Sequence, residues 1–132
     1  MPWLVHPSSQ TRLYVGSSLR EGLKPLVELA RFFHTAGYSV YLPYDDDVQN
    51  SPTDIKTRDS DALRSCDNTI LQLEESSLGV AQELGAARAL NKPVILITKS
   101  ERVIRHNWVR GDSGIKCCAS REQALQLSKS PG

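Results

Sequence analysis

Two carboxylates fall on the apolar sides of helices that the sequence predicts. In the helix that starts near Pro52, Asp59 lies within the apolar stripe, and in the helix over 79–90 Glu83 does the same. A carboxylate on the buried side of a helix costs free energy unless it is paired or used. Carboxylates in such positions can act as nucleophile and as general acid or base, so these two are the catalytic candidates.

Two short loops rich in hydroxyl groups lie near these acids in the sequence. Gly-Ser-Ser at 16–18 follows an apolar run, and Glu-Glu-Ser-Ser-Leu at 74–78 precedes the helix of Glu83. A helix N-terminus after such a loop presents free backbone N–H groups to an anion. The residues that could hold a phosphate are Ser17, Ser18, Ser76, Ser77 and the Gly79 backbone, with Arg20 as counter-charge.

The elements that must position these residues alternate along the chain. Apolar runs predict five strands, over 12–16, 39–42, 69–73, 93–97 and 115–118. Helical spacing predicts four helices, over about 23–36, 52–66, 79–90 and 121–127. This alternation indicates an α/β, flavodoxin/Rossmann-like three-layer fold with a mainly parallel sheet of order 2-1-3-4-5. Ligands of that fold bind at the carboxyl ends of the first and third strands, where both hydroxyl-rich loops lie.

Each carboxylate also has a purely structural interpretation. Glu83 could pair with Arg88 or with a backbone cap, and Asp59 could be a satisfied core acid. For a single inward acid that interpretation would be the simpler one. Two inward acids, both flanking the predicted ligand-binding loops, favour a functional site.

Composition excludes several classes of protein. The 132 residues suit one domain, 1–132, in which we expect 1–10 and 128–132 to be flexible. The net charge of +1 lacks the basic excess of a nucleic-acid or membrane surface. The longest aliphatic run, 94–97, is far shorter than the roughly 20 residues of a membrane span. The first residues lack the pattern of a signal peptide, so we expect a cytoplasmic protein.

The cysteines and the acidic run give no sign of a metal site. Cys66, Cys117 and Cys118 form an odd set without zinc-ligand spacing, and we expect reduced thiols. The three aspartates at 45–47 are most simply a solvated loop. We therefore expect no metal and no cofactor.

The segment around Glu83 resembles a known family. Ser-Leu-Gly-Val-Ala-Gln-Glu-Leu-Gly-Ala at 77–86 is similar to the nucleophile motif of the nucleoside 2-deoxyribosyltransferase superfamily. It most resembles the 2′-deoxynucleoside 5′-monophosphate N-glycosidase branch. The similarity runs from about 13 to 97 and includes the motifs at 14–17, 58–59 and 90–94.

The resemblance implies roles for single residues. It makes Glu83 the nucleophile and Asp59 the active-site aspartate. Ser77 stands where free-nucleoside transferases carry an aspartate that contacts the sugar, and where the monophosphate branch has a phosphate-contacting serine. A hydroxyl can donate to a 5′-phosphate, whereas a carboxylate would repel it. Further substrate-binding positions implied by the resemblance are Arg20, Tyr14 and Tyr44, the last where a family member carries a histidine.

One departure concerns the first strand. The tyrosine that the family carries on this strand aligns with Leu13, one position before Tyr14.

The resemblance implies hydrolysis of the N-glycosidic bond of a (2′-deoxy)nucleoside 5′-monophosphate through a covalent glycosyl-glutamate intermediate. The products would be a free base and (deoxy)ribose 5-phosphate. A transferase that exchanges bases on free nucleosides is one alternative. A non-catalytic nucleotide-binding module is another, although this chain lacks the acids that a receiver-type domain needs after its first strand.

The segment 102–111 resembles a family region that crosses a dimer interface. Its candidates are His106, Asn107 and Trp108, and Asn107 is the substrate-binding candidate of this segment. We expect a homodimer with a shared active site, with a plain surface loop as the alternative.

Overall fold

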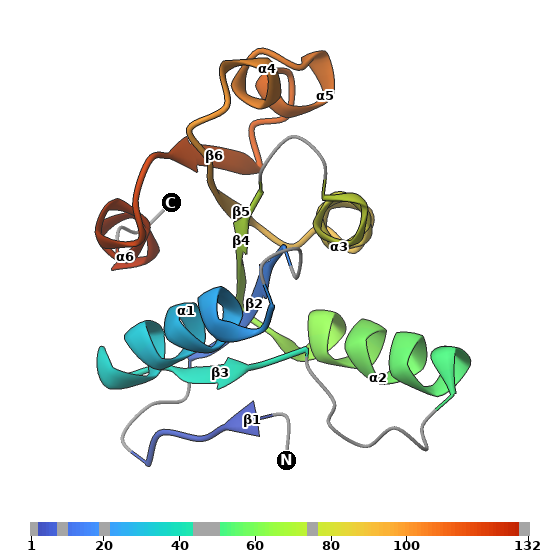
Figure 1. The fold of residues 1–132 in the computed structure, drawn as a ribbon, viewed down its shortest axis with the longest axis vertical. Coiled ribbons are helices and arrows are strands. Elements are labelled where there is room, and N and C mark those ends of the chain that lie inside the picture. The colour runs from blue at the N-terminus through green and yellow to red at the C-terminus, as the bar shows by residue number, and fades with distance from the viewer. Residues whose placement is uncertain (1–2, 8–10, 19–21, 44–50, 74–76, 130–132) are drawn as a thin grey trace.

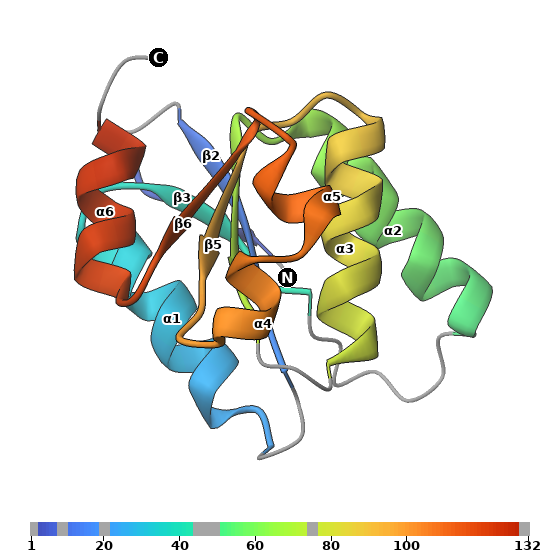
Figure 2. The same cartoon turned by 90° about the horizontal axis from the view of Figure 1, so that it is seen from above.

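The alternating pattern produces a sheet that is covered by helices on both faces (Figures 1 and 2). The computed structural model describes all residues except 1–2, 8–10, 19–21, 44–50, 74–76 and 130–132. The strands are β1 (Trp3–Leu4), β2 (Arg12–Ser17), β3 (Ser39–Tyr41), β4 (Asn68–Gln72), β5 (Val94–Ile97) and β6 (Ile115–Cys118). The helices are α1 (Lys24–Thr35), α2 (Pro52–Ser65), α3 (Leu78–Ala89), α4 (Glu101–Ile104), α5 (Asn107–Arg110) and α6 (Arg121–Lys129).

The predicted strand order is confirmed. The sheet runs β1-β3-β2-β4-β5-β6, and β3, β2, β4, β5 and β6 are parallel neighbours. These five strands are the flavodoxin-like order 2-1-3-4-5 that the sequence predicts. The number of strands is corrected from five to six, because β1 pairs antiparallel with β3 and places Trp3 opposite Tyr41. A two-residue strand carries too little alternation to be recognised in a sequence.

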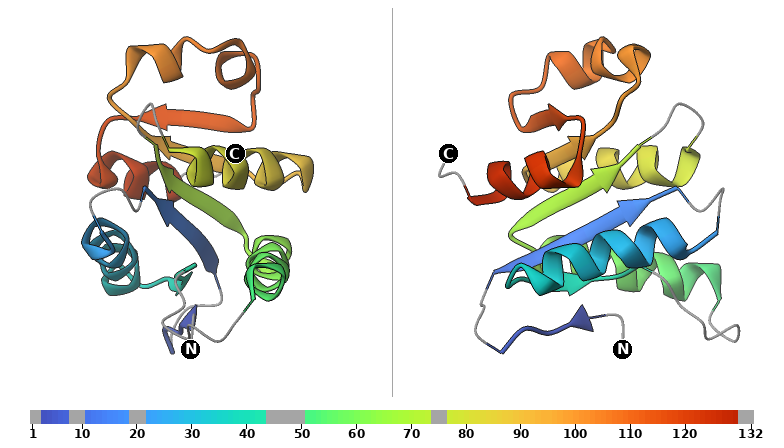
Figure 3. Two further views of the ribbon diagram at one scale, coloured as in Figure 1. Left: turned by 45° about the vertical axis from the view of Figure 1, so that its right-hand side comes forward. Right: turned by 60° about the vertical axis from the view of Figure 1, so that its left-hand side comes forward.

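The helices lie in two layers. Helices α1 and α6 cover one face of the sheet, and α2 and α3 cover the other, as the two rotated views in Figure 3 show. The core on the α1 side includes Leu13, Val15 and Ile70, which are fully buried. The core on the α2 and α3 side includes Tyr14, Tyr41, Leu71 and Leu96. Successive residues of β2 therefore alternate between two separate cores.

The helix boundaries have local causes. Ser51 caps α2 by accepting a hydrogen bond from the Asp54 backbone N–H at 3.1 Å, and Pro52 occupies the first helical position. Gly37 follows α1 with φ of 109°, a conformation that glycine adopts readily. The start of α2 and the end of α1 agree, within one residue, with the helices predicted over 52–66 and 23–36. Helices α4 and α5 were not predicted, because four residues are too few to show a helical period.

Within the part of the chain that the structure describes, no helix has both the length and the apolar character needed to cross a membrane.

Candidate active site

Asp59 and Glu83 line one cavity at the carboxyl ends of β2 and β4. Asp59 projects from the middle of α2 and Glu83 from the second turn of α3, and both are partly buried. The cavity has a volume of about 580 Å³. Its lining residues are Ser17, Ser18, Leu26, Pro43, Asp59, Ser77, Leu78, Gly79, Val80 and Glu83. The structure thus brings both candidate acids, together with Ser17, Ser18 and Ser77, to the predicted edge of the sheet.

Glu83 is held by Tyr14. The Tyr14 hydroxyl donates a hydrogen bond to Glu83 Oε2. Burial raises the pKa of the Glu83 carboxyl to about 7; the hydrogen bond from Tyr14 opposes this shift, and the charge of Asp59 adds to it. Glu83 is therefore balanced between its acid and its anion near neutral pH, which suits a nucleophile or a general acid–base.

Asp59 is held by a second tyrosine. The Tyr41 hydroxyl donates to Asp59 Oδ1 at 2.6 Å. Sequence analysis did not single out Tyr41. It lies on β3 directly opposite Tyr14 of β2 and faces the same side of the sheet. This shared face could have been derived from the parallel register of the two strands.

Gly16 makes room for the Glu83 carboxylate. A Cβ atom at Gly16 would lie 2.9 Å from Glu83 Oε1 and 2.8 Å from Leu71 Cδ2. Both distances are shorter than carbon makes with such atoms, so any side chain here would displace Glu83 or the core beneath it. Gly16 is thus a further residue on which the site depends.

The hydroxyl groups gather where α3 begins. Ser77 is the N-cap residue of α3, and its side chain makes no capping hydrogen bond. Ser17, Ser18 and the exposed Gly79 line the same cavity. A helix N-terminus with hydroxyl groups around it can bind an anion.

Strand β2 presents Tyr14, and not Leu13, to the site. Leu13 is buried in the core on the opposite face, whereas Tyr14 contacts Glu83. Arg88 does not pair with Glu83: it donates from Nε to Asp112 Oδ2 at 2.8 Å and from Nη2 to Asp112 Oδ1 at 3.0 Å. The structural interpretation in which Glu83 pairs with Arg88 is therefore wrong.

Other predicted site residues lie elsewhere or outside the described residues. Asn107 lines a separate cavity on α5 with Trp108 and Asp112, and the described lining of that cavity includes neither Asp59 nor Glu83. Arg20, Tyr44 and Ser76 lie outside the described residues, as does the run 45–47. Among the residues that the structure describes, no three histidines, cysteines or acids form a group that could hold a metal ion.

The fold and the site together define a class of protein. A flavodoxin-like sheet carries a glutamate and an aspartate beside a hydroxyl-lined helix N-terminus, an arrangement suited to attack on a phosphorylated or hydroxylated sugar. The family model of nucleoside 2-deoxyribosyltransferases matches residues 13–126. The chain belongs to this family, and its chemistry is therefore that of N-glycosidic bonds in nucleosides or nucleotides.

Solved structures share the fold. A 2-deoxyribosyltransferase from Bacillus psychrosaccharolyticus superposes with a TM-score of 0.70 at 19% identity, over 86% of this chain and 90% of that one. The CMP N-glycosidase BcmB from Clostridium botulinum gives 0.65 at 25% identity, over 89% and 97%. A conserved protein from Enterococcus faecalis gives 0.65 at 18% identity, over 89% and 96%. No curated protein sequence matches the chain.

Proposed function

We propose that this protein hydrolyses the N-glycosidic bond of a nucleoside 5′-monophosphate, including the 2′-deoxy form. The products are the free base and ribose or deoxyribose 5-phosphate. One observation carries the proposal: a single cavity joins the two carboxylates to the hydroxyl-lined start of α3. A sugar that reacts at Glu83 can therefore extend its 5′-phosphate toward Ser77 and the backbone of Gly79.

The reaction has two displacements. An oxygen of the Glu83 carboxylate forms a bond to the anomeric carbon while the bond from that carbon to the base nitrogen breaks. The electron pair leaves with the base, which takes a proton from the site or from water. Water then attacks the anomeric carbon, the ester bond breaks, and Glu83 regains its carboxylate. The proton that this water releases replaces the one that the departing base has taken. We assign Asp59 to the sugar hydroxyl or to the proton on the departing base.

The type of residue at position 77 favours the monophosphate. Ser77 can donate a hydrogen bond to phosphate, and Ser17 and Ser18 line the same cavity. Apart from Glu83 and Asp59, the described lining of this cavity contains no acid that would repel a phosphate. The similarity to a protein described as a CMP N-glycosidase supports the same choice.

A nucleoside 2-deoxyribosyltransferase is the second candidate. The structure from Bacillus psychrosaccharolyticus with a TM-score of 0.70 is described as such an enzyme. In that case a second base, and not water, would attack the glycosyl ester.

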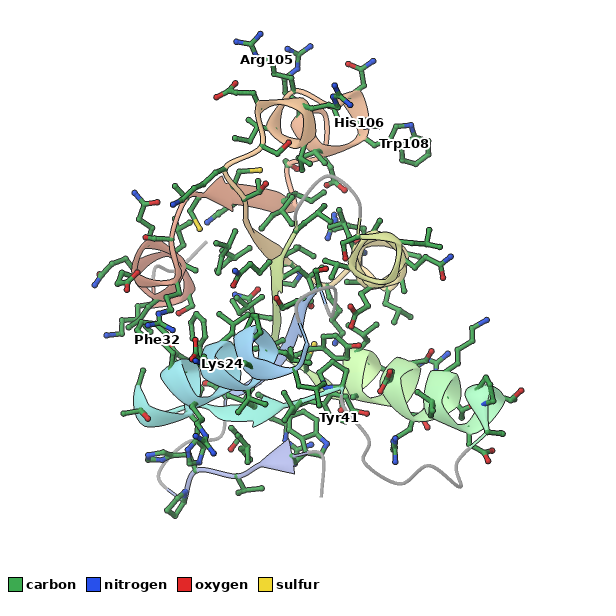
Figure 4. The ribbon with its side chains drawn as sticks, viewed as in Figure 1. Lys24, Phe32, Tyr41, Arg105, His106 and Trp108 are labelled. Carbon is green, nitrogen blue, oxygen red and sulfur yellow. The ribbon has the colours of Figure 1, made fainter. Side chains whose placement is uncertain are left out.

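We also propose that two copies of the chain form a homodimer. An apolar groove of about 640 Å³ lies between α3, α4 and α5, on the predicted interface segment 102–111. It is lined by Leu84, Val103 and Trp108, among others. Trp108 is 85% exposed and points away from the body of the chain in Figure 4. Leu84 follows Glu83 on α3, so a partner bound in this groove would lie close to the helix that carries Glu83.

The test is a chromatographic assay of base release. Purified protein is incubated with ribo- and deoxyribonucleoside 5′-monophosphates and with the matching free nucleosides, each with and without an added acceptor base. We expect base release from monophosphates alone. Base exchange on free nucleosides would support the transferase instead. Absence of turnover on the whole panel would contradict both and favour a nucleotide-binding module.

Two variants of one residue test the phosphate assignment. Ser77→Ala removes a donor, and we expect kcat/KM for monophosphates to fall about tenfold, mainly through KM. Ser77→Asp adds a charge at the same place, and we expect a loss of about a hundredfold or more on monophosphates. Equal losses on monophosphates and on free nucleosides would contradict a role in phosphate binding.

A further inference from the structure

Two tyrosines lie face to face beneath the carboxylates. Tyr14 of β2 and Tyr41 of β3 are register partners in the parallel ladder. Their ring centroids are 5.3 Å apart and the ring planes differ by 18°, so the rings are stacked. Both side chains are buried, with 0% and 1% of their surface exposed. The sheet register thus fixes the two rings side by side.

Each hydroxyl of this pair binds a different carboxylate. Tyr14 donates to Glu83 Oε2, and Tyr41 donates to Asp59 Oδ1 at 2.6 Å. The second distance is that of a strong hydrogen bond from a hydroxyl to a charged oxygen. Burial, and after it the hydrogen bonds and charges of the carboxylates, raise the pKa of both tyrosines. Both hydroxyls therefore stay protonated and can donate at neutral pH.

Tyr41 is also held from its other side. The ring of Trp3, on the edge strand β1, meets the ring of Tyr41 edge-on, with centroids 5.2 Å apart and planes at 66°. The Arg12 guanidinium lies 5.4 Å from the centroid of the Trp3 ring. Figure 4 shows Tyr41 between the edge strand and α2. A side chain packed in this way has little freedom to turn, so its hydroxyl has a fixed position.

We propose that Tyr41 is a positioning residue that acts through Asp59. The hydroxyl of Tyr41 fixes the orientation of the Asp59 carboxylate relative to Glu83, and the ring stack with Tyr14 sets the spacing of the two hydroxyls. Tyr41 is not among the described residues that line the 580 Å³ cavity of Glu83 and Asp59. The proposal rests on the function assigned above, in which Asp59 meets the sugar or the departing base.

Other charged and titratable groups surround Asp59. Glu83 of α3 and Tyr14 of β2 face it, as the effect of the Asp59 charge on their pKa values shows. Arg58, its neighbour on α2, interacts with Tyr41 and lowers the pKa of that hydroxyl, against the larger effects of burial and Asp59. Lys56 lines a second cavity, of about 410 Å³, together with both carboxylates. The experiment must therefore separate the loss of one hydrogen bond from a general change in charge.

Tyr41→Phe achieves this separation because it keeps the ring and removes only the hydroxyl. We expect kcat to fall about 10- to 100-fold with KM changed less than about threefold, since a misplaced catalytic group costs rate more than binding. Tyr38→Phe is the matched control. Its hydroxyl contacts Ser128 Oγ at 3.2 Å on the other side of the sheet, and we expect unchanged kinetics.

A double-mutant cycle tests whether Tyr41 acts through Asp59. Asp59→Ala alone and Asp59→Ala combined with Tyr41→Phe should show the same kcat within about twofold, because the Tyr41 hydroxyl then has no side-chain oxygen to bind at this position. Additive losses in the double variant would overturn the proposal. So would a Tyr41→Phe variant that matches the wild type in kcat.

A second readout does not depend on turnover. With ¹³C-labelled aspartate, the carboxyl signal of Asp59 is followed by NMR against pH in wild type and Tyr41→Phe. Loss of a donor to the charged form should move the midpoint of this titration upward, while Tyr38→Phe leaves it in place. An unmoved midpoint contradicts the inference. A moved midpoint in a protein that releases no base would retain the hydrogen-bond role and reject the proposed function.

Discussion

The two faces of the sheet are built from the same strands but differ in chemistry. On the α1 and α6 face, β2 contributes Leu13 and Val15, which pack with Phe33 and Ile70 in an aliphatic and aromatic core. On the α2 and α3 face, the alternate residues of the same strand are Tyr14 and Gly16. There the core contains tyrosine hydroxyls and bound carboxylates beside aliphatic side chains such as Leu71 and Leu96.

Successive side chains of β2 point to opposite faces of the sheet, and Tyr14, on the α2 and α3 face, contributes to the candidate site. The α1 and α6 face stabilises the fold through burial of apolar side chains. The effect of a substitution there on stability therefore depends mainly on the volume that is lost or gained. On the other face, buried polar groups are tolerated because they bind one another: Tyr14 binds Glu83, and Tyr41 binds Asp59. We therefore expect substitutions on the first face to change stability, and substitutions on the second to change activity.

The largest effect should follow Glu83→Gln. Loss of the nucleophile should lower turnover more than about a thousandfold in the base-release assay. The matched control is Glu28→Gln on α1, an exposed glutamate that pairs with Lys24, and it should keep full activity. Turnover by Glu83→Gln above about a thousandth of wild type would contradict the nucleophile assignment.

Gly16→Ala should be the next most harmful change for activity. Its Cβ would lie 2.9 Å from Glu83 Oε1, so the carboxylate must move, and we expect kcat to fall about a hundredfold. Val15→Ala, one position away on the α1 and α6 face, should instead lower the free energy of unfolding by about 2 kcal/mol. Activity per folded molecule should persist in Val15→Ala. Kinetics and chemical denaturation of both variants test the contrast, and a large loss of kcat in Val15→Ala would break it.

The pH dependence should give an effect of about tenfold. Because the pKa of Glu83 is about 7, the reactive anion becomes scarce at lower pH, and kcat/KM should fall about tenfold per unit below pH 7. A profile that is flat from pH 5 to 8 would contradict this.

Stability should change with pH in the opposite sense. The pKa of Glu83 in the folded protein, about 7, lies above its ordinary value of 4.5. Between these two pH values the folded chain therefore holds a proton that the unfolded chain has lost. This contribution is complete below pH 4.5, falls as the pH rises, and is gone above pH 7. Its size is on the order of 3 kcal/mol. Glu83→Gln should lack it when thermal unfolding is followed across this range.

The smallest effect on a single subunit should follow Trp108→Ala. The side chain is 85% exposed, so the free energy of unfolding of one chain should change by less than about 0.5 kcal/mol. If the groove between α3, α4 and α5 binds a second copy, the mass by light scattering should change from dimer to monomer. A monomeric wild type would contradict the proposed homodimer.

Much of this arrangement follows from local patterns in the sequence. The five parallel strands were predictable from apolar runs, and Asp59 and Glu83 from their places on apolar helix faces. Tyr41 was missed because its role depends on register with Tyr14, a relation between strands that are distant in sequence. Leu13 and Tyr14 could not be separated by composition alone, since both residue types suit a buried strand.

The edge strand β1 has a consequence for handling the protein. Its two residues occupy backbone groups of β3 that would otherwise be available to another chain, and unprotected sheet edges promote aggregation. Removal of Trp3 and Leu4 would abolish both this pairing and the ring contact with Tyr41. Solubility and turnover should therefore decline together when Trp3 and Leu4 are removed.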